Sequence, residues 1–434
     1  MLGFVSCVCK CKCAKGSITI MNTHSRIFRV SARSLAIGLL ASALGVAAGP
    51  PASAQTTYDV EVGRFFNETD HTKEAMRFFP SALKVHQGDR LRFSTKSFHA
   101  VTLLPVGTDA DAWAAERAGG VDKEWSLFLG DVDDGVGALK TNLRAIWPSR
   151  QCGWPGQAVC SFSGYDEETL HSGLALFPNG QSADTKQLDF TVAINSDPGA
   201  VVTVVDILHP DMRMQVEVVA ADETASDPIA VAAASQAQFE DDAAAARALA
   251  KKYSKKKVIK KIKGKKYRTV WAGVEKDGIA LRGYFPKKVT IKQKQGVRWL
   301  FNTNLYSSHT VTFPVKTGVA LSSSFPEFVC DTDGDTGTEP DSAATSSPPY
   351  CSDVFQLELD VPDGFASVTG DGKYKAGKDV ESSGVRGAGI GVSTSQYLLQ
   401  FMKPSSKKGF AYMDLIYGIA RAPMRGKVIV KKGS

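Results

Sequence analysis

Residues 77–93 read Arg77-Phe-Phe-Pro-Ser-Ala-Leu-Lys-Val-His-Gln-Gly-Asp-Arg-Leu-Arg-Phe93, and Ser97-Phe-His-Ala-Val-Thr-Leu103 follows shortly after. The same order returns as Gly283-Tyr-Phe-Pro-Lys-Lys-Val-Thr-Ile-Lys-Gln-Lys-Gln-Gly-Val-Arg-Trp299, followed by Ser307-Ser-His-Thr-Val-Thr-Phe313. In each copy, Phe-Pro precedes an alternating apolar and polar run, a Gly-containing turn and a second run of the same kind. Alternation with a period of two is typical of half-buried strands, and Gly marks turns. The repeat therefore predicts two copies of one β-rich unit.

Further strand signals fill the chain after residue 56. Short β-branched and aromatic runs, such as Val201-Val-Thr-Val-Val205 and Tyr397-Leu-Leu-Gln-Phe401, are separated by Gly, Pro, Asn, Asp and Ser. Each copy closes with a strand, a polar turn that contains Met, and a last strand, at residues 201–216 and 410–428. We therefore predict an all-β chain. Its 434 residues suit two or three domains, and its 43% hydrophobic content is ordinary for a globular protein.

These paired stretches resemble the cupredoxin family, which includes plastocyanin, azurin and the domains of multicopper oxidases. The family pattern is Phe-x-Pro, a strand, a Gly-Asp turn, a strand, and a loop His before Thr-Val. It closes with Tyr-x-Cys-x-x-His-Pro-x-Met-x-Gly and a final strand. The resemblance implies two tandem Greek-key β-sandwich domains, each with its metal position at one end. We place the first domain at 56–222 with an insertion at 106–170, and the second at 267–434 with an insertion at 315–385.

Residues 223–266 are predicted to join the two domains as a partly helical, basic linker. The linker is Ala-rich at first, and Ala243–Lys252 is expected to be helical because Ala, Arg, Leu and Lys favour helices. A run with ten lysines follows between residues 251 and 266. This Lys-rich run could contact acidic polymers or an anionic cell surface, or it could be a solvated linker with a strand edge.

A blue copper centre of this family uses two imidazoles, a thiolate and a weak axial thioether. Carried onto the first domain, the resemblance implies His99 and His209 as the imidazole ligands and Met212 as the axial ligand. The thiolate position falls on Asp206, so this sequence departs from the family at its most characteristic ligand. A carboxylate can join a tetragonal copper(II) site, but it cannot form the covalent copper–sulfur bond, which puts rapid electron transfer in question.

The second domain keeps less of this pattern. Its loop His is His309, and Asp414 lies at the thiolate position. Tyr417 occupies the second His position, and Met424 lies near the Met position after about four extra residues. One imidazole and one carboxylate make a poor copper site. We therefore expect this second site to be vestigial.

Two functional hypotheses follow for the first domain. In one, the chain is an exported copper-binding protein with copper-handling or electron-transfer roles, a redox or copper-exchange protein as partner, and the ligands His99, Asp206, His209 and Met212. In the other, the sandwich was kept as a metal-free structural or binding module. The two His are then structural, Met212 belongs to the core, and Asp206 orients an imidazole. Because the sequence has no nucleophile elbow, phosphate-binding Gly loop or zinc-type cluster, we do not expect an enzyme.

Residues 1–54 have the three parts of a secretory signal. Three arginines lie between residues 26 and 33, Leu35–Ala48 is apolar, and Ala52-Ser-Ala54 has the small residues of a cleavage site. We expect a secreted or otherwise extracytoplasmic protein, in the periplasm or at the cell surface. After removal of the signal, no stretch is long and apolar enough to predict a transmembrane segment.

The formal charge of +7 at pH 7 comes mostly from this leader. Residues 1–54 contain six Lys and Arg and no Asp or Glu, which leaves +1 on the remaining chain. That balance gives no reason to expect a nucleic-acid partner.

Four cysteines follow the leader, and an even number in an oxidising compartment indicates disulfides. We expect the local pairs Cys152–Cys160 and Cys330–Cys351.

Overall fold

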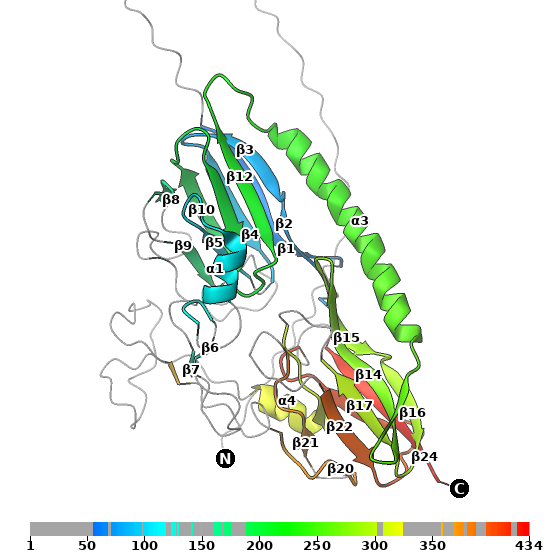
Figure 1. Cartoon of the computed structure of the whole chain (residues 1–434). Coiled ribbons are helices and arrows are strands. Elements are labelled where there is room, and N and C mark those ends of the chain that lie inside the picture. Colours follow the sequence, from blue (N-terminus) through cyan, green and yellow to red (C-terminus); the bar gives the residue numbers. More distant parts are fainter. Residues whose placement is uncertain are drawn as a thin grey trace, which may run out of the picture. The chain divides into compact units, whose positions relative to one another are not determined.

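The computed structural model describes the strands and helices of both copies of the repeat (Figure 1). The described residues are 55–67, 71–97, 99–118, 123–126, 128–129, 140–141, 149, 159–165, 169–174, 188–301, 307–323, 357–358, 368–376, 380–387, 396–417 and 423–433. Within this part of the chain, strands dominate and three helices are present. The prediction of an all-β chain is therefore confirmed.

The first copy of the repeat folds into a sandwich of two five-stranded layers. One layer has the order β2 (Lys73–Phe79), β1 (Thr57–Phe65), β4 (Arg90–Thr95), β10 (Leu188–Ile194) and β8 (Val159–Phe162). The other has the order β3 (Ala82–His86), β12 (Arg213–Val219), β11 (Val201–Val205), β5 (Ala100–Leu103) and β9 (Leu170–Leu174). Alternate residues of these strands point inward, and Val60, Phe93, Val85 and Val216 pack in one buried core between the layers.

The second copy repeats the same strand order. Its first layer is β15 (Ile279–Phe285), β14 (Lys265–Lys276), β17 (Gly296–Leu300), β22 (Gln396–Phe401) and β20 (Lys373–Tyr374), with β13 (Ile259–Ile262) paired to β14. Its second layer is β16 (Lys288–Lys292), β24 (Arg425–Lys431), β23 (Phe410–Met413), β18 (Thr312–Phe313) and β21 (Glu381–Ser382). Trp299, Phe313, Phe401 and Tyr412 fill its core. The chain thus contains two β-sandwiches with the same strand order, in keeping with the two β-rich units that the repeat predicts.

Local details recur between the copies as well. β1 has a bulge between Val62 and Arg64, and β14 has one between Ala272 and Val274. In both bulges the skipped residue is a glycine with positive φ, Gly63 at 64° and Gly273 at 74°. A left-handed conformation favours glycine because it has no Cβ. The duplication therefore extends to irregular backbone that strand periodicity does not predict.

Strands β2 and β15 pair antiparallel and join the first layers of the two sandwiches into one sheet. Glu74 lies opposite Ala280 in this pairing. Both residues stand six positions before the Pro of their Phe-Pro motifs, so equivalent positions of the repeat face each other. A residue near this junction can consequently contact the other sandwich.

The predicted linker forms a longer helix than expected. Helix α3 spans Pro228–Lys255, whereas the sequence predicts a helix only at Ala243–Lys252. Asp227 caps its first turn by accepting a hydrogen bond from Ile229 N–H, and Pro228 at the first helical position suits a helix start. The Lys-rich run continues into β13 and the start of β14. The domain boundaries themselves remain predictions.

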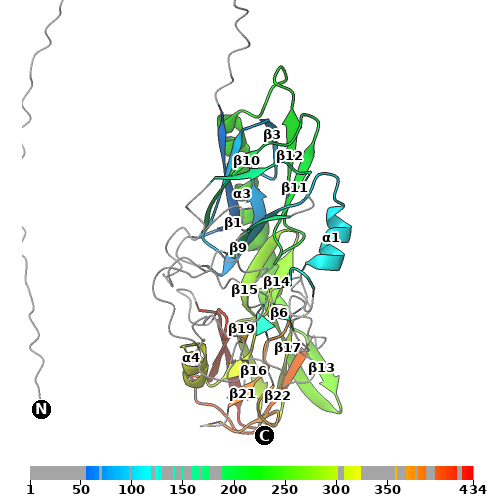
Figure 2. The same cartoon turned by 90° about the vertical axis from the view of Figure 1, so that its left-hand side faces the viewer.

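The remaining described elements lie in the two predicted insertions. They are α1 (Ala110–Arg117), β6 (Phe128–Leu129), β7 (Lys140–Thr141), α4 (Val315–Ser323) and β19 (Leu357–Glu358). Trp113 of α1 and Trp125 are buried in a small cluster beside β5 and β11, and Figure 2 shows α1 on the outside of the first sandwich. β19 pairs with β7, and β7 with β6.

Two sequence predictions fall largely outside the described residues. Cys160 is buried in the core of the first sandwich, but Cys152, Cys330 and Cys351 lie outside the described residues, so both disulfides remain predictions. The signal peptide at 1–54 lies outside them too. Among the described helices, none combines the length and the apolar character that crossing a bilayer requires.

Candidate metal centre

The loop between β11 and β12 carries three of the four predicted ligands. Asp206, His209 and Met212 are held there by backbone hydrogen bonds: Asp206 N–H donates to Met212 O (3.2 Å), and Met212 N–H donates to His209 O (2.7 Å). Asp206 Oδ1 also accepts hydrogen bonds from Leu208 N–H (2.9 Å) and Ala100 N–H (3.3 Å). The carboxylate at the thiolate position therefore ties the closing loop to the start of β5.

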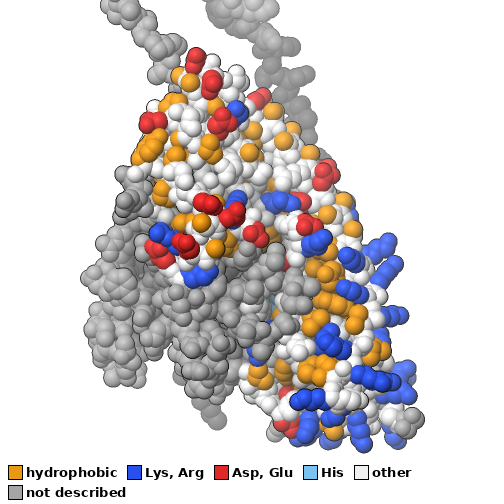
Figure 3. All heavy atoms as spheres, in the orientation of Figure 1, with side chains coloured by type: hydrophobic (Ala, Val, Ile, Leu, Met, Phe, Trp, Pro, Cys, Tyr) orange, Lys and Arg blue, Asp and Glu red, His pale blue; other side chains and the backbone are white. Residues whose placement is uncertain are grey.

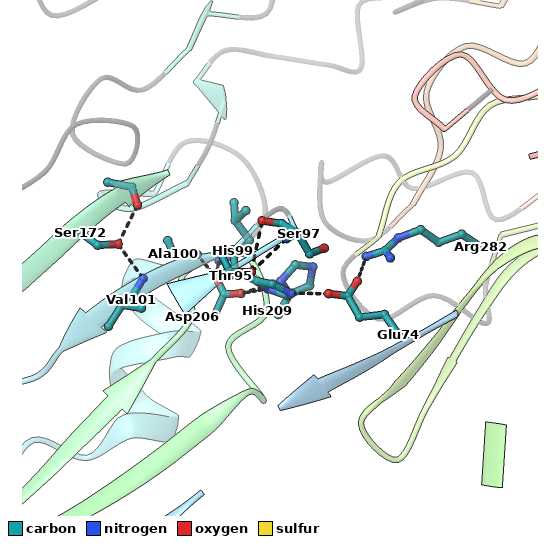
Figure 4. A network of polar contacts seen from close by, with 12 residues as sticks. Glu74, Thr95, Ser97, His99, Ala100, Val101, Ser172, Asp206, His209 and Arg282 are labelled. Atoms are coloured by element: carbon teal, nitrogen blue, oxygen red, sulfur yellow. Dashed lines mark hydrogen bonds and ion pairs between the residues drawn. The ribbon is translucent and has the colours of Figure 1, made fainter. Parts of the chain in front are cut away.

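Two imidazoles converge on the other oxygen of that carboxylate (Figure 4). His99 Nδ1 lies 2.6 Å from Asp206 Oδ2, and His209 Nδ1 lies 2.8 Å from the same atom. The ring centroids of the two histidines are 5.0 Å apart. His99 and Asp206 are fully buried, and His209 is 7% exposed. The ligand atoms of these residues all lie within 4.8 Å of one another, so the structure brings three predicted ligands together.

The fourth predicted ligand, Met212, is buried in the hydrophobic core of the first sandwich. It also lines a pocket of about 400 Å³ together with His209. Residues of the β14–β15 hairpin line the same pocket: Glu275, Lys276, Asp277, Gly278 and Ile279. The His209 edge of the cluster is therefore the side that solvent can approach.

A second carboxylate, which no motif of the sequence indicated, holds the far side of His99. Glu74 Oε1 lies 2.8 Å from His99 Nε2, and both side chains are fully buried. The other oxygen of Glu74 forms an ion pair with Arg282 of β15 (Figure 4). Arg282 is 4% exposed. The cluster is therefore a series of five buried groups that begins at His209 and ends at Arg282 on the second sandwich.

Gly63 leaves space for the side chains of His99 and Glu74. A Cβ at Gly63 would lie 2.0 Å from His99 Nε2 and 2.6 Å from Glu74 Oε1, distances that real Cβ atoms do not reach. Its φ of 64° also disfavours other residues. The bulge in β1 is thus the local feature that lets the His99 ring lie against the sheet.

The buried charged groups of this cluster shift one another's pKa values. Burial alone would lower the pKa of His99, but Glu74 and Asp206 raise it to about 9 through their charges and hydrogen bonds. Burial would raise the pKa of Glu74, yet Arg282 and His99 hold it well below its usual range. Burial would raise the pKa of Asp206 too, but His209 and then His99 hold it low. At neutral pH, His99 is therefore an imidazolium that donates from both nitrogens to carboxylates.

The second sandwich keeps only part of this arrangement. His309 Nδ1 lies 2.8 Å from Asp414 Oδ2, and Asp414 Oδ1 accepts hydrogen bonds from Ile416 N–H (2.7 Å) and Tyr417 N–H (3.1 Å). Asp414 N–H donates to Met424 O, as Asp206 N–H does to Met212 O. The Tyr417 ring, 5.3 Å from that of His309, stands where His209 stands in the first sandwich. The carboxylate–loop contact is thus common to both copies, whereas the second imidazole and Glu74 are particular to the first.

Comparisons with known proteins add little to this site. No protein-family model matches the chain. No curated protein matches it either. Among solved structures, a multicopper oxidase (mgLAC) is similar at 8% sequence identity, covering 87% of this chain and 86% of its own, with a TM-score of 0.15. A likeness this distant says nothing about the function of this chain.

Proposed function

We propose that the first sandwich binds one copper(II) ion between His99, His209 and Asp206, and that the chain is an exported copper-handling protein. The observation that carries the proposal is that two Nδ1 atoms point at one carboxylate oxygen, at 2.6 and 2.8 Å. Imidazole nitrogen with carboxylate oxygen is a donor set that suits copper(II). Copper held in this way would have a weak, non-blue spectrum, because none of these three ligands is a thiolate.

Glu74 supports this proposal as a positioning residue. Metal-bound histidines commonly donate their second ring N–H to a carboxylate, which fixes the ring and the tautomer. Glu74 Oε1 accepts that hydrogen bond from His99 Nε2. Loss of the Nδ1 proton would then leave the His99 lone pair directed toward Asp206 and His209. Metal binding would accordingly release a proton.

The pocket beside His209 supports an entry path. It reaches Met212, so a thioether could complete the ligand set as a weak donor. A copper-exchange protein could approach this same pocket. We therefore favour copper binding and delivery over electron transfer, and over an enzymatic role.

One observation favours the second candidate, a metal-free structural or binding module. In the described structure both nitrogens of His99 already contact carboxylates. The charges of His99 and Arg282 balance those of Glu74 and Asp206 without any ion. In that case the row of buried charged side chains would serve only to hold the closing loop and the junction between the sandwiches in place.

Copper titration of the purified mature protein separates the two candidates. We expect about one Cu(II) per chain by calorimetry and metal analysis, with the electron paramagnetic resonance signature of a non-blue site. The variant His209→Tyr copies the second sandwich, where Tyr417 takes this place, and should lose the binding. His309→Gln is the matched control and should keep it. Absence of saturable binding by the wild type would leave the metal-free module as the function.

A further inference from the structure

Strands β16 and β24 place lysines of like charge directly opposite each other. The strands are parallel, with Lys288 opposite Lys427 and Lys292 opposite Lys431. All four side chains are exposed, whereas Val289, Ile291, Val428 and Val430, which alternate with them, are buried. Neighbouring strands lie only about 4.8 Å apart, and like charges at opposite positions destabilise a sheet. The outer face of this strand pair therefore carries unfavourable repulsion in the free protein.

The first sandwich shows that the fold does not require these lysines. Its equivalent strands β3 and β12 have the same register, with Ala82 opposite Gln215 and Lys84 opposite Glu217. Lys84 and Glu217 form an ion pair at 3.0 Å. The same face of the same sheet is thus nearly neutral in one copy and strongly cationic in the other. Among the described residues, no carboxylate pairs with Lys288, Lys292, Lys427 or Lys431.

The surroundings of the strand pair add to the positive charge. Lys287 and Arg425 join Lys288 and Lys427 around a pocket of about 370 Å³. Residues 251–434 contain 31 Lys and Arg against 16 Asp and Glu, whereas residues 55–222 contain 14 against 24. Figure 3 shows Lys and Arg side chains gathered over the part of the view where Figure 1 places the second sandwich. Such an asymmetry between two halves of a chain indicates an acidic partner for the basic half.

We propose that the outer face of β16 and β24 binds a linear acidic polysaccharide. Its sulfate or carboxylate groups would lie between the opposed lysines and relieve their repulsion. The two lysine pairs are four residues apart, roughly 13 Å along the strands, so one extended polymer can contact both. Single-stranded nucleic acid is usually held by aromatic stacking, and peripheral helices enter membranes with apolar side chains. The described outer positions of β16 and β24 provide no aromatic residue, and Ile429 is half-buried. This proposal is independent of copper binding.

Heparin binding to the full mature chain tests the proposal. The variant K288A/K427Q installs the Ala82 and Gln215 pair of the first sandwich. We expect its heparin affinity in calorimetry to fall about tenfold or more, in keeping with the loss of two cations at an anionic surface. Without heparin, its melting temperature at low salt should rise, because a repulsive pair is gone. Heparin should raise the melting temperature of the wild type more than that of the variant.

A control variant removes two positive charges from a different surface of the protein. The variant K251Q/K252Q lies on exposed positions of α3 and should keep nearly wild-type heparin affinity. Equal losses in the two variants would overturn the assignment to this face, since only net charge would then matter. Failure of the wild type to bind heparin would overturn the proposal as well, and so would stronger binding to single-stranded DNA or phosphatidylglycerol vesicles at the same ionic strength.

Discussion

Arg282 of the second sandwich forms a buried ion pair with Glu74 of the first, and Glu74 also accepts a hydrogen bond from His99 Nε2. Equivalent positions of the repeat carry Met76 and Ala280, so each sandwich supplies one charge that its copy lacks. The junction of the sandwiches and the candidate metal centre are therefore one electrostatic unit. A substitution at Arg282 should therefore change the electrostatic environment of His99, even though the two residues do not touch.

Removing either partner of this pair should destabilise the protein. Each of the variants E74A and R282M strands a buried charge, and we expect a loss of about 3–5 kcal/mol in the free energy of unfolding. E74A should cost more, because His99 also loses its hydrogen-bond acceptor. The double variant E74A/R282M places in each sandwich the residue type of the other copy and should cost less than the sum of the single changes. Urea unfolding measures all three, and strict additivity would contradict the coupling.

Stability should fall as pH rises through the range in which His99 titrates. Its pKa is about 9 in the folded protein against about 6.5 in an unfolded chain. The folded state therefore binds the extra proton. The associated stabilisation is complete below about pH 6.5 and is lost as pH approaches 9. The melting temperature of the wild type should decline across this window, and H99Q, which cannot titrate, should show a flatter profile. Equal slopes in the two proteins would place the titration elsewhere.

The bulge glycine of β1 should tolerate no side chain. In G63A the new methyl group would collide with His99 and Glu74 in addition to straining the backbone at φ 64°. Gly199 is a matched control, since its φ is 89° but nothing lies within 4 Å of a Cβ there. We expect G199A to cost about 1–2 kcal/mol, which is the backbone strain alone, and G63A to cost clearly more and to weaken copper binding. Similar unfolding midpoints for the two variants would argue against the close approach.

The sequence predicted the sandwiches and the closing loop because those features are local and repeated. His99, Asp206 and His209 meet as the resemblance implied, since a strand pair brings both loops to one end of the sandwich. Glu74 and Arg282 escaped prediction because their contact depends on β2 pairing with β15, which no periodicity specifies. A signal did exist: each is a charged residue in a strand at a position where the other copy is apolar. The helix α3 was underestimated because residues 228–242 lack the Lys and Leu that suggested a helix further on.

Helix α3 should behave as a packed part of the fold and not as a free linker, because it contacts strands of both sandwiches. Ala246 is buried against Trp271, Val274, Ile279 and Leu281 of β14 and β15. Arg77 of β2 also pairs with Asp242 of the helix at 3.0 Å. The helix therefore covers an apolar face next to the strand pairing that joins the two sandwiches.

Paired aspartate substitutions test this packing. A246D would bury an unpaired carboxylate and should cost about 3 kcal/mol or more in the free energy of unfolding. Ala245, the preceding residue, is exposed, so A245D adds the same charge and the same change in helix propensity without the burial. We expect its unfolding midpoint to stay near that of the wild type. Of the two variants, only A246D places a charge against Trp271. Equal unfolding midpoints would therefore show that the helix does not pack on the apolar face of β14 and β15.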